Sequence, residues 1–286
     1  MLSKRLSATI CVSLRLTSRG PPPALPSKPG TLGYKYIEFI KRWPAVHDLH
    51  RRAVDGSRWC IMDVKELWRL RGVDCMDDKQ LKPLSVPQLE TLVQSPSELL
   101  KMALLIIALD VPPIGEMLCI FVILFPRLVL TRHFWTAPQR EEFFLKDIEK
   151  SHQRASAVNR KSLPERIEDL TLQQRCHITA LHGGSSILPW SKKKIEKRCM
   201  LLRHIDSKLM LDSMNRDELL FHHFIRRLPY VLGEPDEKLR TNLQTWIQKA
   251  SSVSSPVQYK SLSFEFGNNE EMSNGKRLPI RVRKDE

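Results

Sequence analysis

The sequence predicts an all-α protein in which one long apolar segment separates two helical regions. Beyond residue 131 apolar residues recur at helical spacing, and no stretch there shows the alternation typical of strands. Between residues 102 and 131 only three residues are charged. The 286 residues, 42% of them hydrophobic, suffice for one large domain or two small ones and argue against a fully disordered chain.

The amino terminus, residues 1–33, predicts a mitochondrial transit peptide followed by a proline-rich linker. Residues 1–37 carry six Lys and Arg but no Asp or Glu, and serines and threonines alternate with apolar residues. This composition is typical of transit peptides, and the apolar stretch is too interrupted for a secretory signal. Five prolines between residues 21 and 29 oppose helix formation. The alternative is a disordered basic tail.

The net charge of +14 lies mainly at the two ends of the chain. We expect residues 34–101 to form a helical pre-membrane region, and residues 38–101 are nearly balanced, with 11 basic and 10 acidic groups. Residues 132–286 carry 28 basic and 20 acidic groups. The positive excess therefore lies in residues 1–37 and 132–286.

Residues 102–131 predict a single transmembrane helix. At 1.5 Å per residue, about 20 helical residues cross a hydrocarbon core of about 30 Å, so the segment is long enough for one crossing but not two. Pro112 and Pro113 would interrupt the helix near its middle. A buried helix of a soluble domain is the alternative, although apolarity on all faces exceeds what one-sided packing requires.

Asp110 and Glu116 flank this proline pair within the apolar segment. A carboxylate at membrane depth costs about 2.5–3.5 kcal/mol on insertion scales, so such groups are usually paired, hydrated or functional. They make an ion or proton pathway a legitimate hypothesis. Alternatively, the span runs only over residues 114–130 and leaves both carboxylates close to the headgroups.

The orientation follows from the charges beside the segment. Two basic residues lie in the 20 positions before it and four in the 20 after it. The positive-inside rule therefore predicts that the carboxyl-terminal side faces the matrix of a mitochondrion. His133, Phe134 and Trp135 are expected at the membrane interface.

Residues 132–250 predict a domain of four helices with apolar faces. A capping box of Thr171 and Gln174 starts the first, Ser191 starts the second, Asn215 with Glu218 caps the third, and the fourth begins near Pro235. Residues 251–286 are rich in Ser, Asn and charged groups, so we expect a disordered tail.

The second of these helices begins with an unusual run of cations. A helix amino terminus presents unpaired N–H groups and favours anions, so lysines in its first turn oppose the helix dipole unless they face a phosphate. We therefore predict a surface that faces ribosomal RNA. A solvated helix face and a site for anionic lipid are the alternatives. The residues of this patch are Lys192, Lys193, Lys194, Lys197 and Arg198.

The sequence predicts no enzyme, no bound metal and no cofactor. Six cysteines form no Cys-x-x-Cys pair, and the histidines do not fall at metal-ligand spacings with Cys or carboxylates. No glycine-rich phosphate loop and no Ser-His-Asp arrangement emerges either. We interpret the histidines as structural residues.

Several short sequence motifs resemble those of the LETM domain-containing family, in particular of its short members without a leucine zipper or EF-hands. Leu124-Phe125-Pro126-Arg127, followed by Arg132-His133-Phe134-Trp135-Thr136, is similar to the segment that closes the membrane region in that family. Pro113-Ile114-Gly115-Glu116 resembles its intramembrane Pro-x-x-Glu. The resemblance covers roughly residues 34–255. One departure is Arg227, which stands where the family usually has Gly.

The resemblance implies an inner-membrane protein with a 14-3-3-like helical domain in the matrix. That domain would bind mitochondrial ribosomes and support respiratory-chain biogenesis and mitochondrial structure, with inner-membrane lipids, respiratory-chain assembly factors and a second copy of the chain as further expected partners. The family also implies an alternative function, K⁺/H⁺ or other cation/proton exchange, for which Asp110 and Glu116 are the candidates. A scaffold for respiratory complexes without ribosome contact is a third hypothesis.

Overall fold

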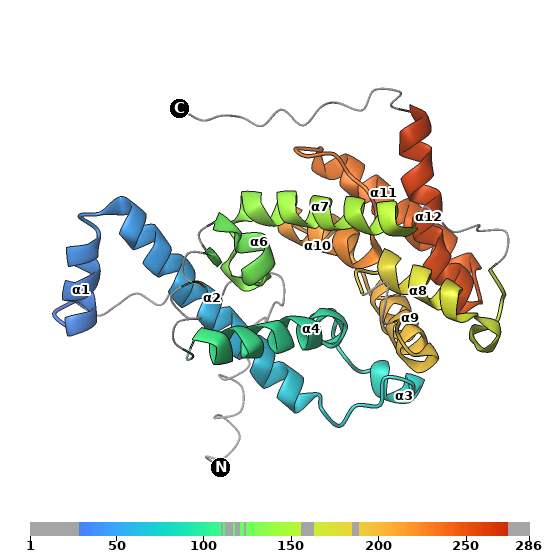
Figure 1. Cartoon of the computed structure of the whole chain (residues 1–286), viewed down its shortest axis with the longest axis horizontal. Helices are drawn as coiled ribbons and strands as arrows, with labels where there is room; N and C mark the ends of the chain where they lie inside the picture. The colour runs from blue at the N-terminus through green and yellow to red at the C-terminus, as the bar shows by residue number, and fades with distance from the viewer. Residues whose placement is uncertain are drawn as a thin grey trace, which may run out of the picture. The chain divides into compact units, whose positions relative to one another are not determined.

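The computed structural model describes residues 29–109, 111, 117, 121–122, 124–155, 163–184 and 189–273. Within these ranges the regular secondary structure is entirely helical, which confirms the predicted all-α class (Figure 1). Residues 1–28 of the predicted transit peptide and linker, ten residues of the apolar segment including Asp110 and Glu116, and the last 13 residues of the predicted tail lie outside the described residues.

The helices follow one another along the chain as Figure 1 labels them. The longest are α2 and α4, which precede and enter the apolar segment. The elements are α1 (Leu32–Ile40), α2 (Pro44–Arg69), α3 (Asp78–Leu81), α4 (Val86–Leu109), α6 (Pro126–Val129), the 3-10 turn η1 (Arg132–Phe134), α7 (Ala137–Ala155), η3 (Ile167–Asp169), α8 (Leu172–Leu181), α9 (Lys192–Asp206), η4 (Leu211–Ser213), α10 (Arg216–Arg226), α11 (Asp236–Ser252) and α12 (Pro256–Ser273).

The chain forms two compact units, and each is made of two stretches of sequence. Unit 1 comprises the described residues up to Phe143 together with Met200–Glu218, and unit 2 comprises Phe144–Cys199 together with those from Leu219 onward. These units do not follow the predicted division at the apolar segment. Residues 200–218, which the sequence assigns to the domain after the membrane, pack with the region before it.

In unit 1, the first half of α4 and the η1 turn both pack against α2. Leu89 and Val93 of α4 are buried, as is Trp59 of α2. The second half of α4 is different, because its large apolar side chains are exposed. They are Leu100, Leu104, Ile106 and Ile107.

Helix α4 is also the one described helix that is long and apolar enough to cross a membrane, over Val86–Ala108. However, 33% of its most apolar window is buried inside the protein. The first half of α4 therefore serves as a core helix of unit 1, and only the part from Met102 onward overlaps the predicted apolar segment.

Unit 2 has a core built from several short elements. Buried residues of η3, α8, α9 and α12 meet there, and the half-buried Leu163 and Trp190 pack against them. The members of this cluster are Ile167, Leu170, Ile178, Ile195 and Val257.

The helix starts in the carboxyl-terminal half are confirmed. Thr171 and Gln174 form the predicted capping box, with hydrogen bonds in both directions. Asn215 accepts a hydrogen bond from the backbone N–H of Glu218, whose carboxylate accepts one from the N–H of Asn215. Helices α9 and α11 begin directly after Ser191 and Pro235, as predicted.

The prediction of disorder after residue 250 is wrong for residues 256–273. Helix α12 occupies them, and Val257, Tyr259 and Leu262 are buried. The Tyr259 ring packs edge-on against Trp246 of α11, with ring centroids 5.7 Å apart. The polar composition conceals this helix because few apolar residues suffice to bury one narrow face.

Arg227 ends α10 in an unusual conformation. Its φ of 58° is the one positive value among the described residues other than glycine. Glycine adopts this region without steric cost, so a left-handed Arg227 is consistent with the glycine expected here from the family resemblance. The side chain compensates, because its guanidinium lies 4.4 Å from the Phe224 ring centre and donates to the carbonyl of His182.

Candidate functional site

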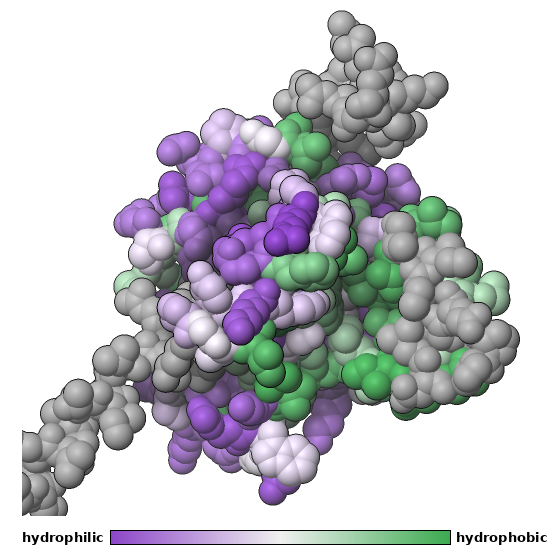
Figure 2. All heavy atoms as spheres, turned by 90° about the vertical axis from the view of Figure 1, so that its left-hand side faces the viewer, coloured by the Kyte–Doolittle hydropathy of each residue, from purple (hydrophilic) through white to green (hydrophobic). Residues whose placement is uncertain are grey.

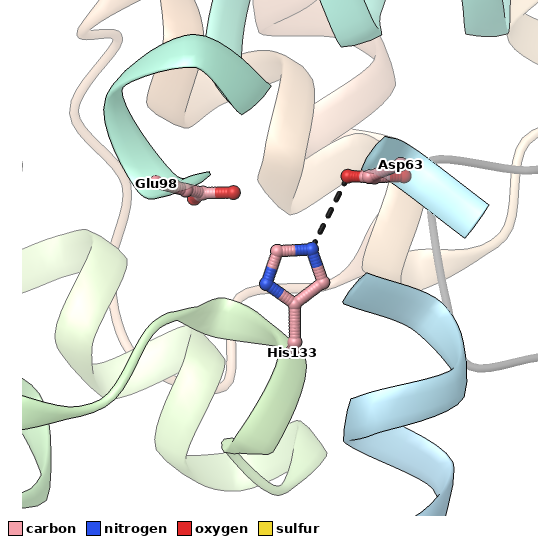
Figure 3. A group of neighbouring side chains, drawn as sticks. All are labelled: Asp63, Glu98 and His133. Atoms are coloured by element: carbon pink, nitrogen blue, oxygen red, sulfur yellow. Dashed lines mark hydrogen bonds and ion pairs between the residues drawn. The ribbon is translucent and has the colours of Figure 1, made fainter. Parts of the chain in front are cut away.

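A buried polar cluster joins three elements of unit 1. Asp63 comes from α2, Ser95 and Glu98 come from α4, and Arg132 and His133 come from η1. We call these five residues the polar clasp. Its charged side chains are at most 11% exposed. Figure 3 shows Asp63, Glu98 and His133 pointing toward one another from their separate helices.

The geometry of the clasp centres on one carboxylate oxygen. Oδ2 of Asp63 lies 2.9 Å from Oγ of Ser95, 3.0 Å from Nη2 of Arg132 and 3.2 Å from Nε2 of His133. Nε of Arg132 lies 2.9 Å from the carboxylate of Glu98. One guanidinium thus bridges carboxylates from α2 and α4.

The electrostatics of the clasp keep Asp63 ionised. Burial alone would raise the pKa of Asp63, but the hydrogen bond from His133 and the charge of Arg132 outweigh burial and lower it below its ordinary value. The ion pair of Asp63 and Arg132 therefore compensates each of these two groups for the hydration that it loses on folding. A buried pair of this kind is costly to break, because removal of one partner leaves the other uncompensated.

The surroundings hold η1 close to α2. The ring of Trp59 packs edge-on against His133, with centroids 4.9 Å apart, and lies 5.4 Å from the Arg132 guanidinium. A Cβ at Gly56 would lie 2.7 Å from both the carbonyl oxygen of His133 and the ring of Phe134. The close approach of the two backbones therefore requires glycine at this position.

A metal ion does not suit this cluster. Asp63, Glu98 and His133 each offer a ligand atom, all within 4.8 Å of one another. Arg132 already occupies the space between the two carboxylates and would repel a cation placed there. The chemistry of the clasp is that of an internal ion pair, and its function is to fix three elements together.

No pattern in the sequence predicts the clasp. His133, with Phe134 and Trp135, is predicted at the membrane interface, but the structure buries His133 in the protein and leaves the other two half-buried. The one feature in the sequence that could have indicated the clasp is the pair Arg132 and His133 directly after the apolar segment. Only the fold shows that their partners are Asp63, Ser95 and Glu98.

The predicted basic patch at the start of α9 is only partly a surface. Lys193, Lys194 and Lys197 are exposed, and Nζ of Lys194 lies 5.0 Å above the Trp190 ring. Lys192 is half-buried and donates to the carbonyl of Glu168. Three lysines are therefore directed toward solvent.

Arg198 differs from these lysines, because it is turned inward. Its guanidinium donates to the carbonyl of Ile225 at 3.3 Å and lies 5.6 Å from the Trp190 ring centre. Burial, with a smaller contribution from the charge of Arg227, lowers the pKa of Arg198 to about 9. Arg198 therefore supports unit 2 from within, although it remains charged at neutral pH.

Comparisons with known proteins identify relatives for the middle of the chain. A family model described as "LETM1-like, RBD" matches residues 84–179. A curated relative, "LETM1 domain-containing protein 1" of Xenopus tropicalis, is 33% identical over 112 residues, which make up 38% of this chain and 31% of the frog protein. The match thus spans about a third of that relative.

No solved structure matches the chain. The 14-3-3-like form of the helical domain therefore stays a prediction. The region matched by the family model contains the apolar segment and four residues of the clasp, but it ends before the basic start of α9.

Proposed function

Since the chain is a member of the LETM domain-containing family, we propose that it is an inner-membrane protein of mitochondria whose helical domain binds mitochondrial ribosomes from the matrix. The match of residues 84–179 to the family's RBD carries this proposal. Respiratory-chain biogenesis benefits because its hydrophobic subunits need a ribosome close to the membrane. This is a tethering function and requires no catalysis.

The clasp supports a tether by linking the helical region to the membrane-proximal segment. Glu98 lies just before the exposed apolar part of α4, and Arg132 lies just after α6. Their ion pair stiffens the base from which the apolar segment departs. A rigid base would hold the bound ribosome at a fixed distance from the membrane, whereas a flexible linker would not.

The exposed lysines of α9 supply the polyanion contact in this proposal. Lys193, Lys194 and Lys197 lie on a helix start that already favours anions. RNA phosphates release counterions on binding such groups, so the affinity decreases with salt.

The test is co-sedimentation of the full-length chain, in lipid nanodiscs, with purified mitochondrial ribosomes over a series of salt concentrations. The triple variant Lys193→Gln, Lys194→Gln, Lys197→Gln should reduce the slope of log affinity against log salt by about 2–3. The matched control replaces the equally exposed Lys65, Lys79 and Lys150 and removes the same charge. Absence of binding by the unchanged protein at low salt would refute the tether.

Cation/proton exchange is the second candidate function, and it rests on Asp110 and Glu116 within the apolar segment. Both residues lie outside the described part of the chain. Reconstituted protein should then lose ion flux in the variant Glu116→Gln and retain ribosome binding. Flux that is unchanged by Glu116→Gln and Asp110→Asn excludes this function. A scaffold without ribosome contact predicts membrane partners whose co-purification resists ribonuclease.

A further inference from the structure

The two ends of the apolar segment are held together in the structure. Nζ of Lys101, directly before the segment, donates to the carbonyl of Leu130 at 2.8 Å and to that of Arg127 at 3.3 Å. Nε1 of Trp135 donates to the carbonyl of Pro126 at 3.3 Å. Lys101, which precedes the segment, therefore caps the backbone that ends it, whereas Trp135 adds a local contact at the far end.

The polar clasp also joins the two flanks of the apolar segment, one helical turn before Lys101 on α4. Glu98 precedes the apolar segment and Arg132 follows it, yet their charged groups lie 2.9 Å apart. Asp63, on α2, contacts both Arg132 and Ser95. These groups are buried among protein atoms, so the contact is part of the core of unit 1.

A third set of contacts lies farther along the chain. Nζ of Lys208 donates to the carbonyls of Lys82 at 2.8 Å and Leu84 at 2.6 Å. Nε2 of His204 lies 2.8 Å from the carboxylate of Asp78. Residues 200–218 thus belong to the same compact unit as the region before the apolar segment.

These contacts cannot coexist with one crossing of a bilayer. A transmembrane segment places its two flanks on opposite sides of a hydrocarbon core of about 30 Å. Glu98 and Arg132 would then be separated by at least that distance, rather than the observed 2.9 Å. The same holds for Lys101 with Leu130 and for Lys208 with Leu84.

We propose that the apolar segment is a re-entrant membrane anchor: its two flanks, up to Lys101 and from Leu130 onward, lie on the same face of the bilayer, and the acyl chains of the near leaflet cover the exposed apolar side chains of its described residues. Both flanks, and with them both units, then lie in the same compartment. This topology replaces the single crossing predicted from length and composition. It goes beyond ribosome binding and does not depend on it.

The dimensions of the segment fit one leaflet. The part of α4 from Met102 to Leu109 is about 12 Å long, close to half of the hydrocarbon thickness. The 28 residues between Lys101 and Leu130 are too few for two crossings of a core of about 30 Å, which need about 20 helical residues each.

The exposed side chains supply the surface for lipid. Large apolar residues of the segment are exposed both before and after its middle. On the face that Figure 2 draws, hydrophobic side chains of the protein gather in patches between hydrophilic ones. Exposed apolar side chains in such number are typical of a surface that contacts a membrane or another protein. The exposed residues are Leu104, Ile106, Ile107, Val111, Met117, Phe121, Leu124, Phe125 and Leu128.

The decisive experiment counts labels per molecule, so it needs no uniform orientation. Lys79→Cys and Lys150→Cys place one exposed thiol on each flank of the full chain, in which the six native cysteines are replaced by alanine. Sealed proteoliposomes are treated with a membrane-impermeant maleimide and the intact mass is measured. The re-entrant anchor predicts molecules with two labels or none. A population dominated by one label overturns it, and detergent must give two labels throughout.

The unmodified chain offers a second test if the cysteine-free variant does not fold. Trypsin is added outside sealed proteoliposomes, and the protected fragments are identified by mass spectrometry. The re-entrant anchor predicts that outward-facing molecules lose both flanks and that inward-facing molecules stay intact. Protected fragments that carry one whole flank mean a crossing and overturn the proposal. Ribosome binding by the same vesicles is measured separately, so a failed tether and a failed anchor give different results.

Discussion

The two units bury positive charge in different ways. In unit 1, Arg132 meets two carboxylates, those of Asp63 and Glu98. In unit 2, Arg227 donates to the carbonyl of His182 and stacks on Phe224. Burial lowers the pKa of Arg227 to about 10, although the charge of Asp147 opposes this shift. The two buried arginines are thus stabilised differently, Arg132 by carboxylates and Arg227 by a carbonyl and an aromatic ring.

The histidines show the same difference. His133 in unit 1 lies 3.2 Å from an ionised carboxylate. His223 in unit 2 is fully buried, and its Nε2 donates to the carbonyl of Leu239 at 3.0 Å. Burial lowers the pKa of His223 to about 4 and that of His182 well below its ordinary value. Acid should therefore affect the two units in different pH ranges.

The largest expected effect is the loss of Arg132. Arg132→Met leaves Asp63 and Glu98 buried without a cation, so unit 1 should lose about 3–5 kcal/mol of stability. Hydrogen exchange of α2 and α4 peptides in the full chain measures the loss. The control is Lys41→Gln, which removes the exposed 2.6 Å pair with Glu38 and should leave the stability nearly unchanged, because solvent screens an exposed pair. A loss no larger than that of the control would show that the clasp is not a structural ion pair.

Acid provides the next test, and it separates the units. His223 binds a proton less readily in the folded than in the unfolded state, so its neutral form stabilises unit 2 fully above pH 6.5. Between pH 6.5 and about 4 this stability is lost, by about 3 kcal/mol for one fully buried histidine. Glu234 and Arg226 are the charged groups that act on it.

In unit 1 the contribution of Asp63 has the same direction, because folding again favours the deprotonated form, but it covers a lower pH range. The folded pKa is lowered, so this contribution is present above about pH 4 and decreases as pH falls through the folded pKa. Exchange rates in α10 and α11 of unit 2 should therefore rise first on acidification. His223→Gln, which still donates a hydrogen bond, should reduce that rise. An unchanged pH profile in this variant would contradict the assignment.

A smaller effect is expected from added bulk at the close approach of α2 and η1. Gly56→Ala places a Cβ 2.7 Å from a backbone oxygen, so η1 must shift and unit 1 should lose about 1–3 kcal/mol. Gly72→Ala is the matched control in the same unit, because a Cβ there meets nothing within 4 Å. Equal thermal stability of the two variants would argue against the observed packing.

The smallest difference is expected at helix caps, where both units use the same local chemistry. Thr171→Ala in unit 2 and Asn215→Ala in unit 1 should each cost about 1 kcal/mol, because each leaves a helix N–H unpaired. Thr241→Ala, inside α11, is the control and should be nearly neutral. Denaturant unfolding monitored by exchange in each unit measures all three. Clearly unequal losses of stability in Thr171→Ala and Asn215→Ala would mean that burial, and not local capping, determines the loss.

Local features of this protein were predictable because short-range physics determines them. The capping box at Thr171, the cap at Asn215, the helix starts after Ser191 and Pro235, and the apolar character of the segment from Met102 all depend on neighbours within a few residues. The family resemblance also depends on short motifs of consecutive residues. Helix α12 was missed because its polar composition hides a narrow buried face.

Only the tertiary structure decided which distant groups meet. No pattern in the sequence pairs Asp63 with Arg132, or Lys208 with the carbonyl of Leu84, because such contacts depend on how several helices pack at once. Hydropathy measures the length of an apolar segment but not the positions of its two flanks. The sequence by itself therefore determined that the chain has a membrane-seeking segment, and the fold decided that both ends of that segment lie together.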